Sequence, residues 1–193
     1  MYHSLPGDAR FWSFLVAIDE DLAEATRKQA CPCGGPLHCA NYPRKPRGGP
    51  DKLPEGYQFR LSFCCARDGC RKRTTPPSVR FLGRKVYLAV VVILVAAMRH
   101  GPNPRRLRQL SEHFGADRRT IARWQAFWRE IFPNTPFWKV ARARLTPDRD
   151  TTYLPRALLD AFLQNDADCD GWGRLLRFLA PITIPGALRI AVS

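Results

Sequence analysis

Cysteines are concentrated in one part of the chain, and this cluster constrains the fold more than any other feature. Zinc takes about four soft or borderline ligands in a tetrahedral array, and ribbon folds supply them from two short turns, or knuckles, in separate chain segments. We therefore expect a small metal-binding ribbon of short antiparallel strands over residues 31–83. Five of the seven cysteines flank its basic, Pro- and Gly-rich insert: Cys31, Cys33, Cys64, Cys65 and Cys70.

The two knuckles suggest which four thiols bind a structural zinc ion. The first reads Cys-Pro-Cys-Gly-Gly and the second Cys-Ala-Arg-Asp-Gly-Cys, so each has glycine where a tight turn is needed. A ribbon knuckle usually has two residues between its cysteines, whereas these have one and four. Other side chains could therefore replace a ligand: His38, Cys39 or Cys64. The expected ligands are Cys31, Cys33, Cys65 and Cys70.

The rest of the composition favours an intracellular globular protein. The first 25 residues show no signal-peptide pattern, so we expect a cytoplasmic, nucleoid-associated protein whose cysteines bind metal rather than form disulfides. Cys169 is distant from the cluster and is interpreted as an incidental thiol. The longest apolar stretch, Val86–Met98, would span roughly 20 Å as a helix, short of the roughly 30 Å bilayer core. It predicts a buried helix and no membrane partner.

Positive charge is confined to two segments. The formal net charge is +14. Residues 41–85 hold 12 Lys and Arg against 3 acidic residues, and residues 99–130 hold 8 against 3, so these two segments account for the whole excess. Charge of this size predicts attraction to a polyanion, and its location predicts that both segments bind it.

Residues 107–124 resemble a helix-turn-helix. An apolar face over 107–114 ends at Gly115, which supplies a left-handed turn, and Asp117 is a favourable N-cap for a second helix. With the 86–98 helix, these two helices would form a three-helix core within a domain at 84–130. In the second helix, three side chains at helical spacing would pack inward: Ile121, Trp124 and Trp128.

This packing leaves the basic residues of the second helix facing outward, in the position where recognition helices contact base edges in the major groove. Arginine there can bond guanine O6 and N7 in bidentate fashion. The irregular insert of the ribbon would instead contact phosphates. The candidate DNA-binding residues are Arg118, Arg119, Thr120 and Arg123 in the helix, and Arg44, Lys45 and Arg47 in the loop.

The flanking segments are predicted to be helical. Phe11–Gln29 has apolar residues at helical spacing, with its acids, Asp19 among them, mostly on the solvent side, and forms an N-terminal segment at 1–30. Strands are expected at Pro36–Tyr42 and Tyr57–Cys65. A short edge strand is expected at the end of the segment 74–81, before Gly83. A C-terminal tail, 131–193, would hold helices near Pro155–Gln164 and Gly171–Leu179. The fold class is therefore α+β, mostly α.

No catalytic centre is expected. A nuclease or transposase core needs two or three carboxylates that converge on a divalent metal ion. Such carboxylates usually come from the strands of an α/β domain of more than a hundred residues, and the 131–193 tail is too short and predicts no series of strands. We expect a binding protein and not an enzyme.

Three segments together resemble the zinc-ribbon plus helix-turn-helix proteins associated with bacterial insertion sequences. The resemblance rests on 31–35, 64–71 and 115–124, and extends over residues 31–130. It implies a DNA-recognition component of a transposase, with a catalytic transposase subunit as a possible partner. The one-residue spacing of the first knuckle departs from the usual pattern.

The sequence therefore predicts a sequence-selective double-stranded DNA-binding protein of a mobile element. Two alternatives remain open at this point. The chain could be a protein-interaction adaptor of a transposase or transcription complex, in which case DNA contact is incidental. It could also be a zinc-ribbon protein that binds RNA.

Overall fold

We describe the protein from a computed structural model of the 193-residue chain. The structure describes residues 9–44, 53–81, 117–145, 154–163 and 169–184, and positions 104, 105, 108 and 112. The predicted helix at 86–98 lies outside the described residues, as do Lys45 and Arg47. Of the predicted helix at 107–114, only positions 108 and 112 are described, and both are helical. Among the residues that are described, no helix combines the length and the apolar character that crossing a membrane requires.

The first element is the long helix α1, Ala9–Lys28, which confirms the helix predicted at 11–29. Its first half buries an apolar face, and its last turn carries Arg27 and Lys28, which interact favourably with the negative end of the helix dipole. Ala30 follows in the left-handed region, with φ of 56°, and turns the chain toward the first cysteine. The buried face consists of Phe11, Trp12, Leu15 and Ile18.

Two small antiparallel sheets follow α1, and their strands β1 to β4 lie within the two predicted strand segments, 36–42 and 57–65, apart from Pro43 at the end of β2. The edge strand predicted at the end of 74–81 is wrong, because residues 75–81 form no strand and β5 lies earlier, at 73–74. In the three-stranded sheet, of order β1-β4-β5, Leu37 pairs with Cys65, His38 with Cys64 and Cys64 with Arg73. The edge strand β5 comes just before Pro76-Pro77, which lack the N–H groups that a longer strand would need. The strands are β1 Leu37–Cys39, β4 Phe63–Cys65 and β5 Arg73–Thr74, with β2 Tyr42–Pro43 and β3 Phe59–Arg60 in the two-stranded sheet.

Short helices make up the C-terminal half, and both helices predicted in the tail are confirmed. The predicted recognition helix also begins where expected, at Arg118. A single π-helical turn and several 3-10 turns connect the α-helices. The elements are α4 Arg118–Ala126, η2 Phe127–Ile131, η3 Phe132–Asn134, α5 Pro136–Ala141, η4 Arg142–Arg144, α6 Arg156–Phe162, α7 Cys169–Leu179 and η5 Ala180–Thr183.

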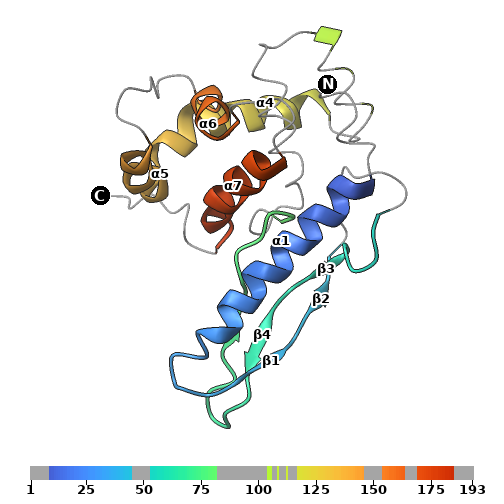
Figure 1. Ribbon diagram of the computed structural model, residues 1–193, viewed down its shortest axis with the longest axis vertical. Coiled ribbons are helices and arrows are strands. Elements are labelled where there is room, and N and C mark those ends of the chain that lie inside the picture. Colours follow the sequence, from blue (N-terminus) through green and yellow to red (C-terminus); the bar gives the residue numbers. More distant parts are fainter. Residues whose placement is uncertain are drawn as a thin grey trace.

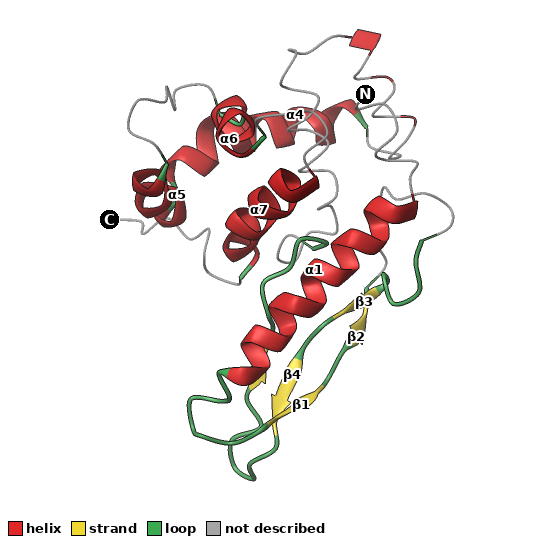
Figure 2. Ribbon diagram, in the orientation of Figure 1, coloured by secondary structure: helices red, strands yellow, loops and turns green. Residues whose placement is uncertain are grey.

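Two hydrophobic clusters divide the length of α1 between them. Its first half packs in the larger cluster, with Ile121 of α4, Trp128, and the buried leucines of α6 and α7. Near its other end, Ala23 packs in a smaller cluster with Cys31, Cys65 and their strand neighbours. Figures 1 and 2 show the C-terminal helices on one side of α1, with α7 beside its middle, and the strands on the other side, reaching its far end. The C-terminal helices are thus part of the main core.

A buried ion pair lies where these two parts meet. The Asp19 carboxylate accepts hydrogen bonds from the Ser78 hydroxyl (2.5 Å), the Val79 amide (2.6 Å) and Arg80 Nε (2.8 Å). Arg80 also donates to the carbonyls of Gly56, Tyr57 and Phe59. Both charged side chains are 1% exposed. Asp19 is therefore buried, although the sequence pattern placed the acids of α1 mostly on its solvent side.

We expect Asp19→Ala to destabilise the fold by about 3–5 kcal/mol, because it leaves the Arg80 guanidinium buried without its counter-charge. Urea unfolding at neutral pH measures the change. Glu20→Ala is the matched control, since Glu20 is an exposed acid on the same helix and its loss should change stability by less than about 0.5 kcal/mol. A change below about 1 kcal/mol for Asp19→Ala would contradict a structural role for the pair.

Candidate metal centre and the exposed face of α4

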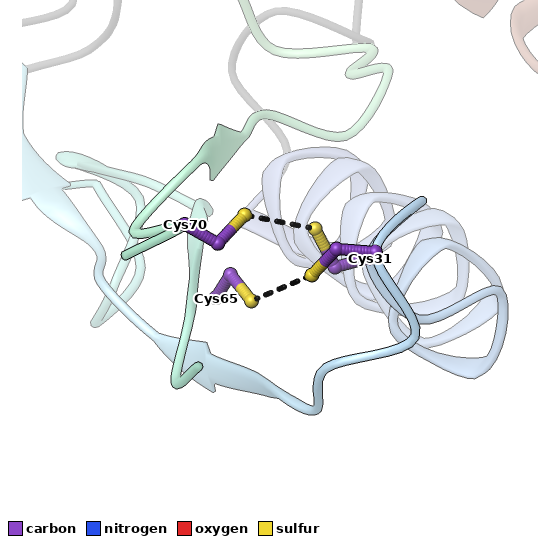
Figure 3. A group of neighbouring side chains, drawn as sticks. Cys31, Cys65 and Cys70 are labelled. Carbon is purple, nitrogen blue, oxygen red and sulfur yellow. Dashed lines mark hydrogen bonds between the residues drawn. The ribbon is translucent and has the colours of Figure 1, made fainter. Parts of the chain in front are cut away.

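Four cysteine thiols converge at the end of α1. Cys31 and Cys33 lie in the turn between α1 and β1, Cys65 ends β4, and Cys70 lies in the turn before β5. Their sulfur atoms all lie within 4.8 Å of one another, and the Cys31–Cys70 and Cys33–Cys65 sulfurs are 3.8 and 3.5 Å apart (Figure 3). These are the four ligands that the sequence predicted, and together they could hold a metal ion.

The sulfur spacing matches a tetrahedral centre. A zinc–sulfur bond of about 2.3 Å places the sulfurs of a regular tetrahedron about 3.8 Å apart. The observed separations therefore require only small side-chain movements to surround one ion. Four thiolates around one ion also fill every position of a tetrahedron, which is the arrangement of a structural site and leaves no open position for a substrate.

Two glycines allow the first knuckle to close with a single residue between its cysteines. Gly34 has φ of +79°, and its amide donates to the Cys31 carbonyl (2.7 Å), while the Cys31 amide donates to the Gly35 carbonyl (3.1 Å). A Cβ on Gly35 would lie 2.7 Å from the Cys65 sulfur. The two knuckles approach so closely here that only glycine fits.

The second knuckle is longer but equally constrained. The Arg67 amide points at the Cys65 sulfur (3.4 Å), and the Cys70 amide donates to the Arg67 carbonyl (3.1 Å). Gly69 makes the turn with φ of +81°. The Arg67 guanidinium then donates to the Cys33 carbonyl (2.8 Å), which ties the second knuckle to the first.

Strand geometry separates the four thiols from the three alternatives left open by the sequence, through the pleat for His38 and Cys64 and through position along the strand for Cys39. His38 pairs with Cys64, so both lie on the face opposite Cys65, and the Cys64 thiol donates to the Arg71 carbonyl (3.4 Å). Cys39 is exposed at the far end of β1. None of the three belongs to the metal-ligand group found among the described residues.

Burial and hydrogen bonds make the four thiols unequal. The Gly35 amide and the neighbouring thiols lower the pKa of Cys33 to about 6. The Arg67 amide favours the Cys65 thiolate, but burial and the neighbouring thiols outweigh it and raise the pKa of Cys65 to about 12. Four thiolates this close repel one another, so full deprotonation of the cluster requires a bound cation.

The predicted DNA-binding residues of α4 lie far from the cysteines. In Figure 1, α4 lies near the start of α1, and β1 and β4 lie near its end. Asp117 caps α4 as predicted, because its carboxylate accepts the Thr120 amide (2.6 Å). Arg119 and Arg123 are exposed, whereas Ile121 on the other side of the helix is buried.

The other predicted DNA-binding residues are less exposed, or their side chains are not described. Thr120 is 8% exposed and its hydroxyl accepts a bond from Arg123 (2.8 Å), so it does not lie on the outer face. The side chains of Arg118 and Trp124 lie outside the described residues. Arg44 is half-buried beside β2, where its amide donates to the Gln58 carbonyl (2.6 Å).

Comparisons with known proteins return no match: no protein-family model, curated protein or solved structure matches the chain.

We expect Cys65→Ser to abolish stoichiometric metal binding, because a hydroxyl is a poor zinc ligand in a set that otherwise consists of thiolates. The neighbouring Cys64→Ser and the exposed Cys39→Ser are the matched controls, and both should keep one metal ion per chain. Metal analysis of the purified, zinc-loaded proteins measures this. If Cys64→Ser loses the metal and Cys65→Ser keeps it, the assignment of ligands is wrong.

Proposed function

We propose that this chain is a sequence-selective double-stranded DNA-binding protein with one structural zinc ion. The observation that carries the proposal is the outer face of α4, where Arg119 and Arg123 are exposed while Ile121 and Trp128 are buried in the main core. This arrangement suits a helix that packs on its protein through one face and enters a groove with the other.

Zinc is the metal that best fits the donor set. Four thiolates in a tetrahedral arrangement select zinc or iron–sulfur chemistry over hard cations such as calcium and magnesium. Ala23, Leu37 and Phe63 pack around the cluster and limit access of water on one side. Zinc bound here would hold the two knuckles together and so stabilise the ribbon.

The geometry of α4 fits major-groove readout. Nine residues make a helix roughly 14 Å long, comparable with the roughly 12 Å width of the groove. Arg119 and Arg123 are four positions apart, so they lie on neighbouring turns of one face. The bond from Arg123 to Thr120 restricts its side chain, which lowers the entropy lost when it binds a base edge.

The positive charge of the chain supports a nucleic-acid partner in general, and the resemblance to insertion-sequence proteins supports a role in mobile-element DNA recognition in particular. In that role a catalytic transposase subunit would be a further partner. Competition by single-stranded RNA would indicate the RNA-binding alternative, and a duplex affinity that does not change with salt would indicate the adaptor.

We expect Arg119→Ala and Arg123→Ala each to weaken binding to a selected site by about tenfold to a hundredfold, with much less effect on random duplex, because each removes a base contact worth about 1–3 kcal/mol. The loop variant Arg44→Ala should weaken both duplexes about equally. Anisotropy titrations on a selected site and on random duplex measure both.

Lys139→Ala is the control for charge alone, because Lys139 is an exposed cation on α5. It should change neither titration by more than about twofold. The proposal fails if the wild-type protein loses less than about tenfold in duplex affinity between about 50 and 200 mM salt, since six or more phosphate contacts imply a loss on the order of a thousandfold.

A further inference from the structure

A dense group of cations surrounds the second cysteine knuckle and β5. All four side chains are exposed, and Asp68 is the only acid between the first and the last of them. We propose that these residues, the knuckle cations, form a phosphate-binding surface for duplex DNA. They are Arg67, Arg71, Lys72 and Arg73.

Two of the four knuckle cations are restrained by contacts within the protein. Arg67 donates to the Cys33 carbonyl (2.8 Å). Arg73 donates to the Ala40 carbonyl (3.2 Å) and stacks on the Tyr42 ring, with its guanidinium carbon 5.6 Å from the ring centroid. Because these bonds use only part of each guanidinium, N–H groups remain to bind phosphate. Prior restraint also lowers the entropy that binding would cost.

The conformation of Arg71 points to a role for its side chain outside the fold. Its φ is +45°, in the left-handed region that residues other than Gly, Asn and Asp rarely adopt. Its one ion pair, with Asp68 (3.3 Å), is formed between side chains 69% and 97% exposed, and such pairs add little stability. The turn from the knuckle into β5 accounts for this backbone conformation, since the Arg71 amide donates to the Arg67 carbonyl (3.4 Å) and its carbonyl accepts the Cys64 thiol (3.4 Å). Neither packing nor the ion pair accounts for an arginine side chain at a position that favours glycine, which fits a role in binding.

The metal centre alone does not account for these cations. Zinc with four thiolates carries a formal charge of −2, so one explanation of the nearby cations is that they balance this charge and do nothing else. The four knuckle cations exceed the combined negative charge of that centre and Asp68 by one. Arg27 in the last turn of α1 adds one more positive charge, whereas Lys28 is paired with Glu24. The metal-loaded end of the protein is therefore positive.

The proposal places this surface and the exposed face of α4 on one duplex. The 20-residue helix α1 is roughly 30 Å long and leads from the core that holds α4 to the metal cluster. This length is comparable with one turn of B-DNA, about 34–36 Å, so the proposal places the two contacts on different parts of the duplex, on the scale of a helical turn. The irregular knuckle fits phosphate contacts, which position a protein without reading sequence. This inference rests on the proposed function.

The test compares two double variants of the zinc-loaded, full-length protein on random duplex. In Arg71→Ala/Lys72→Ala the changed side chains are exposed, so the fold should be kept. The matched control is Lys139→Ala/Arg142→Ala, which removes two exposed cations on α5 and η4. Affinity is measured between about 50 and 200 mM salt, and zinc affinity by competition with a chelator.

We expect the slope of log affinity against log salt to fall by about 1.8 in the knuckle variant, about 0.9 for each phosphate that the variant no longer neutralises, and to change by less than about 0.3 in the control. The charge-restoring Arg71→Lys/Lys72→Arg variant should recover the wild-type slope. Zinc affinity should stay within about twofold of wild type in all variants.

Three results would overturn the inference. In the first, the wild-type response is steep but the knuckle variant keeps its slope. In the second, the control loses as much slope as the knuckle variant, which indicates a diffuse charge effect. In the third, zinc affinity falls while duplex affinity does not, which indicates that the cations only balance the metal centre. A shallow wild-type response would instead remove the proposed DNA binding itself, and this inference with it.

Discussion

The Asp19 carboxylate accepts three hydrogen bonds inside the protein and forms an ion pair with Arg80, and the arrangement of the two halves depends on this contact. The pair joins the middle of α1 to the segment that leaves the cysteine-bearing sheets. Arg80 extends the connection to the carbonyls of Gly56, Tyr57 and Phe59, and the Ser78 amide extends it to Thr183 of η5. Burial of charge at this point is costly unless every partner is in place, so the network favours one arrangement of the strands on α1.

With this contact formed, α1 acts as a rigid connection between two sites. Its first half is fixed in the main core beside α4, and its last turns reach the cluster that contains Cys31 and Cys65. Arg177 of α7 pairs with Asp21 at the surface and adds a second tie between α1 and the C-terminal helices. The proposed recognition face of α4 and the proposed phosphate surface of the knuckle are thereby held at a set separation, as binding to two places on one duplex requires.

Sequence patterns located the features that depend on local chemistry. The cysteine and glycine pattern selected the four thiols that the structure brings together, because each pair lies in a short turn that fixes its own geometry. Asp117 was recognised as a helix cap for a similar reason, since a cap and its amide are three residues apart. The tail helices followed from apolar periodicity, but periodicity does not reveal that they complete the main core.

The count of charged residues along the sequence was less informative about binding surfaces, because it does not separate buried charged side chains from exposed ones. Arg60 and Arg80 belong to the basic segment 41–85, yet they are 2% and 1% exposed and their guanidinium groups lie over the Phe81 ring, away from any partner molecule. Asp19 has the same helical context as exposed acids, and only its partners about 60 residues away distinguish it. The exposed cations beside Cys70 were part of the same count, and the structure separates them from the buried ones.

We propose that four thiolates, and no imidazole or carboxylate, enclose one zinc ion at the end of α1. X-ray absorption at the zinc edge of the loaded protein tests this most directly, because it reports the number and kind of bonded atoms. We expect a single shell of four sulfur atoms at about 2.3 Å. A shell with fewer sulfurs and a nitrogen or oxygen contribution at about 2.0–2.2 Å would contradict it.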